Sequence, residues 1–269
     1  MGSREAGTGP RADAAKALRD ALRVVDSRRA EDFAERILRR ESVRLFGDSK
    51  RLERLTPWLD LVTTGDLLPS GLHDDDVRGA LGLRREPQPM LVAGPGEVVL
   101  LDGHLPLCRP YLGLPVDAVR TIRSDAHYLL TIENLASFHD ATRVLGTGNP
   151  GLLLYTGGMP SPAWRSLYRR ILAGLPSGTA VYHWGDIDEG GFRIAAALAA
   201  SAREESRTLH PWRMSPSHAR HVASAGTLSS AATARAAHWA RVTGWDHIAL
   251  ELEELPLQLE QEALDPVLP

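Results

Sequence analysis

Two aspartates, Asp186 and Asp188, have the residue type and the spacing to hold a metal ion. They follow the segment 181–184, which reads as a short buried strand, and they precede the glycine pair at 190–191. In an extended backbone, residues i and i+2 face the same side. Both carboxylates can therefore point together just past the strand end, where ligands bind in open α/β sheets. Carboxylate oxygens in such a place suit a hard cation such as Mg²⁺.

Other interpretations of the same residues remain open. Asp, Glu and Gly are common wherever a strand turns into a helix, so the two aspartates could serve the turn and the helix start. A calcium loop of the EF-hand kind fits poorly, because apolar Ile187 holds the second position and Ala197 stands where the bidentate Glu belongs. A haloacid dehalogenase phosphatase also uses Asp-x-Asp, but it expects Thr or Val in place of Gly190. A metal site would need a third carboxylate.

Strands that alternate with helices dominate the sequence after Pro115 and indicate an α/β fold. A mainly parallel sheet with right-handed crossovers is expected from this order. Its strands would lie at residues 128–132, 151–156, 181–184, 209–214 and 247–250, with helices between them, including one near 231–242. The carboxyl ends of parallel strands share one edge of the sheet. Glu133, directly after the first strand, is therefore the third carboxylate expected beside Asp186 and Asp188.

This combination of one Glu and a later Asp-x-Asp is the pattern of the Toprim fold, which topoisomerases, primases and several nucleases share. Such carboxylates hold one or two Mg²⁺ ions that neutralise a phosphodiester, orient it and activate water, while a Glu can also move protons. Glu133, Asp186 and Asp188 are the predicted catalytic and metal-binding residues. The predicted cofactor is Mg²⁺, with Mn²⁺ as the alternative.

The first part of the sequence predicts helices and then two short strands. Helical spacing recurs at residues 12–25 and 30–40, and a third helix is expected to begin at Asp48 or Ser49. Strands at 90–93 and 98–101 flank a Gly-Pro-Gly turn, which is the order of a winged-helix module. The expected domains are a partly disordered helical segment at 1–41, a winged-helix-like α+β domain at 42–116, a Toprim domain at 117–250 and an acidic tail at 251–269.

Composition limits where the protein works. The 269 residues suffice for one large domain or two small ones. Because the sequence has no apolar run of about twenty residues and no apolar stretch at its N-terminus, we expect a cytoplasmic protein that does not span a membrane. The single cysteine, Cys108, excludes an intramolecular disulfide and a multi-cysteine metal site.

Charge distribution points to candidate DNA contacts. The net charge of −3 argues against nucleic-acid binding through bulk charge, but residues 15–54 hold twelve Lys or Arg against eight acids. Arg44, Lys50 and Arg51 could meet phosphates there, with an ordinary solvated helix face as the alternative. His139, six residues after Glu133, is a further candidate for a phosphate contact, and a helix-surface or core histidine is its alternative.

Several sequence words are more specific than the acids, and they resemble the JetD family, the nuclease subunit of the Wadjet plasmid-defence system. They are residues 131–139 (TIENLASFH), 155–161 (YTGGMPS), 183–188 (HWGDID), 190–194 (GGFRI), 210–214 (HPWRM) and 259–264 (LEQEAL). Residues 44–51 (RLFGDSKR) look like that family's entry into its winged-helix, CAP-like domain. The resemblance covers roughly residue 42 to the C-terminus.

The resemblance implies a homodimeric relative of the type IIB topoisomerase A subunit, which cuts double-stranded plasmid DNA when an SMC-like motor complex presents it. Glu133, Asp186 and Asp188 match the family's metal-binding acids. JetD proteins usually carry a further N-terminal arm domain, for which the segment 1–41 is short, so a complete subunit, a truncation and a short variant all remain open. A non-catalytic DNA-binding or scaffold subunit of the same complex is the alternative function.

The tyrosines suggest how DNA would be cut. A topoisomerase of this type needs a nucleophilic tyrosine in the winged-helix domain to store the broken phosphodiester covalently. No tyrosine precedes Tyr111, which lies beside Pro110 at the end of that predicted domain. The sequence therefore predicts hydrolysis without a covalent protein–DNA intermediate.

Overall fold

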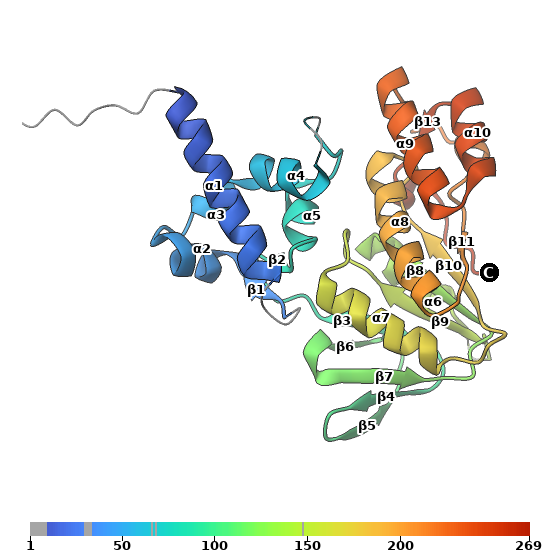
Figure 1. Cartoon of the computed structure of the whole chain (residues 1–269). Coiled ribbons are helices and arrows are strands. Elements are labelled where there is room, and N and C mark those ends of the chain that lie inside the picture. The colour runs from blue at the N-terminus through green and yellow to red at the C-terminus, as the bar shows by residue number, and fades with distance from the viewer. Residues whose placement is uncertain (1–9, 30–33, 66, 68, 147) are drawn as a thin grey trace, which may run out of the picture. The chain divides into compact units, whose positions relative to one another are not determined.

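The chain forms two compact units, Met1–Glu86 and Pro87–Pro269, in a computed structural model (Figure 1). The structure describes residues 10–29, 34–65, 67, 69–146 and 148–269. None of the helices within these ranges is long and apolar enough to cross a membrane.

The first unit is mainly helical. Its elements are α1 (Pro10–Arg29), β1 (Arg36–Ile37), α2 (Leu38–Phe46), α3 (Arg51–Arg54), α4 (Thr56–Thr64), α5 (Asp74–Gly79) and β2 (Leu83–Arg84), with β1 and β2 parallel. The expected α1 is confirmed, since Ala17, Ala21 and Val24 recur at helical spacing and are buried in the core of this unit. The helix expected from Asp48 is divided at Leu55, the residue between α3 and α4.

The second unit is built on a six-stranded sheet with the order β11-β10-β8-β9-β3-β6. The strands are β3 (Met90–Ala93), β6 (Leu112–Leu114), β8 (Tyr128–Ile132), β9 (Gly151–Tyr155), β10 (Ala180–Trp184) and β11 (Leu209–Pro211). The four strands from β11 to β9 are parallel, whereas β3 is antiparallel to both of its neighbours. Every residue of β8 is buried, as expected for a central strand covered on both faces. The predicted α/β fold with a mainly parallel sheet is confirmed.

Helices and smaller elements complete this unit (Figure 1). The helices are α6 (Leu135–Val144), α7 (Pro162–Gly174), α8 (Glu189–Glu204), α9 (Ser230–Thr243) and α10 (Asp246–Glu254), with single turns at η1 (Val116–Ala118), η2 (Pro216–Ala219) and η3 (Gln261–Ala263). A three-stranded antiparallel sheet consists of β5 (Gly103–Pro106), β4 (Glu97–Leu100) and β7 (Val119–Arg123), and β12 (Gly226–Thr227) pairs with β13 (Leu257–Gln258). Helix α7 packs against β7, and α9 packs against α8 and α10.

Four expectations differ from this structure. The helix expected at 30–40 does not form as such: residues 30–33 lie outside the described residues, β1 occupies 36–37, and α2 begins at Leu38. The division into compact units falls after Glu86 and not after residue 116, because β3 and β6 belong to the six-stranded sheet. The two strands expected to form one wing, β3 and β4, lie in different sheets. The strand expected at 247–250 is part of α10, since Ile248, Ala249 and Leu252 are buried at helical spacing.

Candidate metal centre

The carboxyl ends of β8 and β10 meet at the point where the strand order reverses. From β8 the chain passes to β9 on one side and then to β10 on the other, which is the topological switch where α/β sheets bind ligands. Ile132 and Trp184, the last residues of the two strands, are register partners. The amide of Glu133 donates to the Trp184 carbonyl at 3.1 Å. Glu133 therefore lies beside the loop that carries Asp186, as the sequence predicted.

Gly185 gives the Glu133 side chain the space that it occupies. A Cβ atom at position 185 would lie 2.5 Å from Glu133 Oε2 and 3.0 Å from His183 Nε2. The same Oε2 accepts a long hydrogen bond of 3.4 Å from the Asp186 amide. The glycine between β10 and the aspartates thus lets the Glu133 carboxylate reach across the strand end to the Asp186 backbone.

Asp188 caps the helix that follows the loop. It is the N-cap residue of α8, and its Oδ1 accepts a hydrogen bond of 2.8 Å from the Gly191 amide. This is the turn-and-cap role that the local pattern also allowed. Asp188 is half-buried, and its negative charge contributes to the electrostatics of Asp186.

The C-terminal segment crosses the strand ends and completes the site. Ile187 and Leu259 form an antiparallel bridge, with the Ile187 amide donating to the Leu259 carbonyl at 2.8 Å. Next to the bridge, the backbone amide of Gln261 donates to Asp186 Oδ1 at 2.7 Å. The backbone amide of Asn134 in turn donates to Gln261 Oε1 at 2.9 Å. Residues from β8, the β10 loop and the C-terminal segment are therefore tied together at one sheet edge.

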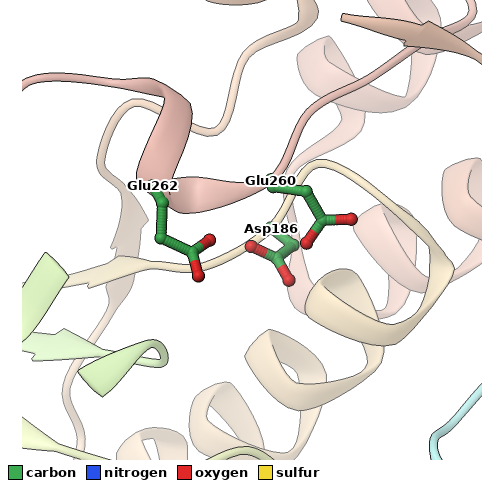
Figure 2. A group of neighbouring side chains, drawn as sticks. All are labelled: Asp186, Glu260 and Glu262. Carbon is green, nitrogen blue, oxygen red and sulfur yellow. The ribbon is translucent and has the colours of Figure 1, made fainter. Parts of the chain in front are cut away.

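Asp186, Glu260 and Glu262 form the acidic cluster at this edge, as Figure 2 shows. Each offers one carboxylate oxygen, and these oxygens lie within 4.8 Å of one another. Oxygens around one Mg²⁺ or Ca²⁺ ion, at metal distances of about 2.0 to 2.6 Å, have separations in this range. Asp186 is half-buried, whereas both glutamates are exposed. Among the residues that the structure describes, Glu133 and Asp188 border this cluster without belonging to it.

The electrostatics of Asp186 fit a cation site. Burial and the neighbouring charges of Asp188, Glu260 and Glu262 raise the pKa of Asp186 to about 7, although the hydrogen bond from the Gln261 amide opposes the shift. Crowded carboxylates repel one another, and a divalent cation among them would remove that repulsion. The donor set is oxygen only, which suits Mg²⁺ or Mn²⁺.

His183 in β10 and Glu189 in α8, on either side of the loop that carries Asp186, are buried. Burial lowers the pKa of His183 to about 3, so this imidazole stays neutral. Glu189, in the first turn of α8, is buried and accepts a hydrogen bond of 2.6 Å from Arg235 Nε of α9. Burial raises the pKa of Glu189, and the guanidinium of Arg235 acts in the opposite direction. This ion pair ties the start of α8, and with it the Asp188 cap, to α9.

The sequence reasoning missed Glu260 and Glu262 as site residues. Both fall in the region expected to be an acidic tail, separate from the domain at 117–250. In the structure they belong to the same compact unit as Asp186. The available signal was the word LEQEAL at 259–264, which carried the family resemblance but no expected role.

The candidate DNA-binding side chains differ in whether they already bond a carboxylate of the protein. Arg44 donates to both carboxylate oxygens of Glu41, at 2.8 and 2.5 Å, and this bonding lowers the pKa of Glu41. Arg51 donates to Asp20 of α1 at 2.9 and 2.6 Å. Lys50 is exposed at the start of α3, and no ion pair of its side chain occurs among the described residues. Arg44 and Arg51 thus have carboxylate partners, whereas Lys50 has no ion-pair partner among the described residues.

His139 packs with aromatic side chains. Its ring makes edge contacts with Tyr111, at a centroid distance of 5.1 Å, and with Phe138, at 6.3 Å. The half-buried ring is therefore part of an aromatic group that joins α6 to Tyr111, the residue before β6. This arrangement matches the alternative of a packed histidine, and no contact with the acidic cluster is recorded for the described residues.

Comparison with known proteins identifies the family. Comparison with curated proteins returned no match. The family model described as "Wadjet protein JetD, C-terminal" matches residues 96–268. The match lies within the second unit and covers five of the six strands of the main sheet, all but β3, together with the loop that carries Asp186 and Asp188 and the C-terminal segment that carries Glu260 and Glu262. The chain therefore belongs to the JetD family of Wadjet proteins.

Proposed function

We propose that this chain is the DNA-cutting subunit of a Wadjet-type plasmid-defence complex, with a Mg²⁺-dependent Toprim centre. Mn²⁺ is expected to replace Mg²⁺. In this proposal the subunit acts as a homodimer on double-stranded plasmid DNA that an SMC-like motor presents. The acidic cluster of Asp186, Glu260 and Glu262, next to Glu133 at the switch point of the sheet, is the observation that carries the proposal.

The side chains have distinct roles in this function. Asp186, Glu260 and Glu262 would hold the cation, and Asp188 would contribute negative charge while it fixes the start of α8. When bound, Mg²⁺ would neutralise phosphodiester charge and lower the pKa of a water molecule. Glu133, whose carboxylate lies against the Asp186 amide, is suited to accept a proton from the attacking water.

Plasmid restriction in cells tests the catalytic role. Asp186→Asn and Glu133→Gln change one charge each and preserve size, so dimerisation and DNA binding should persist while restriction is lost. Glu254→Gln is a matched control, since Glu254 is an exposed carboxylate on α10 outside the cluster. Full restriction by the Asp186→Asn variant would instead support the non-catalytic scaffold function.

Cation binding tests the roles of Glu260 and Glu262 directly. The double variant Glu260→Gln/Glu262→Gln removes two of the three carboxylates of the cluster. Calorimetric titration of the full chain with Mn²⁺ should show affinity at least about tenfold lower than for wild type, because each lost charge weakens a hard-cation site. The Glu253→Gln/Glu254→Gln variant carries the same net charge change on α10, and equal losses in both variants would refute the specific role.

Hydrolysis is the proposed chemistry because the required tyrosine is missing. The segment 1–110 contains no tyrosine, and Tyr111 makes an edge contact with Phe138 at 5.5 Å. A cleavage reaction stopped with denaturant should therefore release DNA that carries no protein. Recovery of DNA joined to a tyrosine would show a covalent mechanism instead.

A further inference from the structure

His183 is a fully buried imidazole in β10 with one ring nitrogen engaged. Its Nδ1 lies 2.9 Å from Thr131 Oγ1 on the neighbouring strand. The Thr131 hydroxyl donates its proton to the Tyr182 carbonyl at 3.1 Å, so its oxygen is left to accept from Nδ1–H. This bonding favours the tautomer with the proton on Nδ1 and the lone pair on Nε2. Among the described residues, Nε2 has no hydrogen-bond partner.

His183 Nε2 and Glu133 Oε2 both lie close to the space beside Gly185. A Cβ atom on Gly185 would lie 3.0 Å from His183 Nε2 and 2.5 Å from Glu133 Oε2, so the two atoms cannot be farther apart than the sum of these distances. Both are hydrogen-bond acceptors when Glu133 is ionised, and neither can satisfy the other. A small molecule that donates two hydrogen bonds would give Nε2 the partner that it lacks among the described residues and would add a bond to the Glu133 carboxylate. Water does so, and at about 2.8 Å from each acceptor it spans their separation.

We propose that His183 is a positioning residue of the metal centre, and that together with Glu133 it holds a water molecule beside Gly185. Such a water would donate one proton to each acceptor, which fixes the Glu133 carboxylate and leaves the oxygen lone pairs of the water free. The inference deepens the proposed function and rests on it, because Glu133 matters only if the acidic cluster binds a cation.

Two substitutions separate the roles of the ring nitrogens. His183→Asn keeps an amide near the Nδ1 position, where it can still bond Thr131, and removes the acceptor at Nε2. His183→Gln reaches the Nε2 position with an amide oxygen and gives up the bond to Thr131. The Asn variant should bind Mn²⁺ about tenfold more weakly than wild type in calorimetry, as is usual for lost outer partners of a metal site. The Gln variant should stay close to wild type.

The opposite order of affinities would overturn the proposal, because a purely structural role depends on the Thr131 bond. Circular dichroism and thermal melting check that both variants fold. If either fails to fold, nitrogen NMR of the wild-type imidazole decides, since a proton on Nε2 would refute the acceptor role. Asp186→Asn belongs in the same titration. If it binds Mn²⁺ like wild type, the metal centre itself is wrong; if only His183→Asn does, the role of His183 alone is wrong.

Discussion

Gly185 leaves room for the side chains of Glu133 and His183. In Gly185→Ala the new Cβ would lie 2.5 Å from Glu133 Oε2, so the carboxylate must move. The atom concerned is the end of a flexible side chain, and we expect a small change in melting temperature but about tenfold weaker Mn²⁺ binding. Calorimetry and thermal melting of the same preparation measure both effects.

Gly191→Ala is the matched control for this prediction. Its Cβ would lie 2.2 Å from the Asp186 carbonyl oxygen, a backbone atom that cannot turn away. This variant should therefore lose stability, by about 1 to 3 kcal/mol. A greater loss of stability in Gly185→Ala than in Gly191→Ala would contradict the assignment of Gly185 to cation binding and of Gly191 to backbone packing.

Burial of His183 makes the stability of the protein depend on pH. Its pKa falls from 6.5 to about 3 in the folded chain. Below about pH 6.5 the unfolded chain binds a proton that the folded chain does not, so the free energy of unfolding decreases as the pH falls toward 3. Between pH 7 and pH 5 the contribution of His183 is a loss of about 2 kcal/mol. Urea unfolding of wild type and His183→Gln with EDTA should show this difference, and equal pH slopes would exclude it.

At the scale of elements, the start of α8 depends on Asp188. Asp188→Asn keeps an oxygen that accepts from the Gly191 amide, whereas Asp188→Ala loses it. We expect nearly unchanged stability for the Asn variant and a loss of about 1 kcal/mol for the Ala variant, measured by chemical unfolding. If Asp188 also serves the cation, both variants should bind Mn²⁺ more weakly by calorimetry. Normal affinity in the Asn variant would restrict Asp188 to the cap.

Elements with a strong local pattern were predictable from the sequence, and so were the acids attached to them. The mainly apolar β8 and the alternation of strands with helices placed Glu133 and Asp186 at one sheet edge. The segment with Glu260 and Glu262 contains only the two-residue β13 and the single turn η3, which give no periodic signal. Its position depends on long-range contacts, such as the bridge between Ile187 and Leu259 and the bond from the Gln261 backbone amide to Asp186, which no local pattern can reveal.

The local sequence pattern also could not predict which strands pair with each other. Val92 of β3 pairs with Leu154 of β9, which comes much later in the chain, and the expected hairpin with β4 does not form. The run at 247–250 is too short for its apolar residues to distinguish a strand from a helix.

At the scale of the whole molecule, the boundary after Glu86 predicts which fragment can fold alone. Residues 87–269 keep all six strands of the main sheet and should unfold in one cooperative transition and bind Mn²⁺ like the full chain. Residues 117–269 lack β3 and β6, which exposes the edge of β9, and we expect aggregation. Thermal melting and size-exclusion chromatography compare the two fragments, and a monodisperse, cooperative 117–269 would favour the other boundary.

The position of the C-terminal segment has a consequence for the order of folding. The bond from Gln261 to Asp186 joins residues 75 apart in sequence, and the bond from Asn134 to Gln261 joins residues 127 apart. Contacts of such long range must overcome the entropy of closing a large loop before they contribute stability. The parallel strands can pair earlier, with Glu133 and Asp186 already at their ends. We therefore expect the acidic cluster to be among the last features to form, so that a partly folded chain would lack the complete set of carboxylates that the proposed DNA cleavage requires.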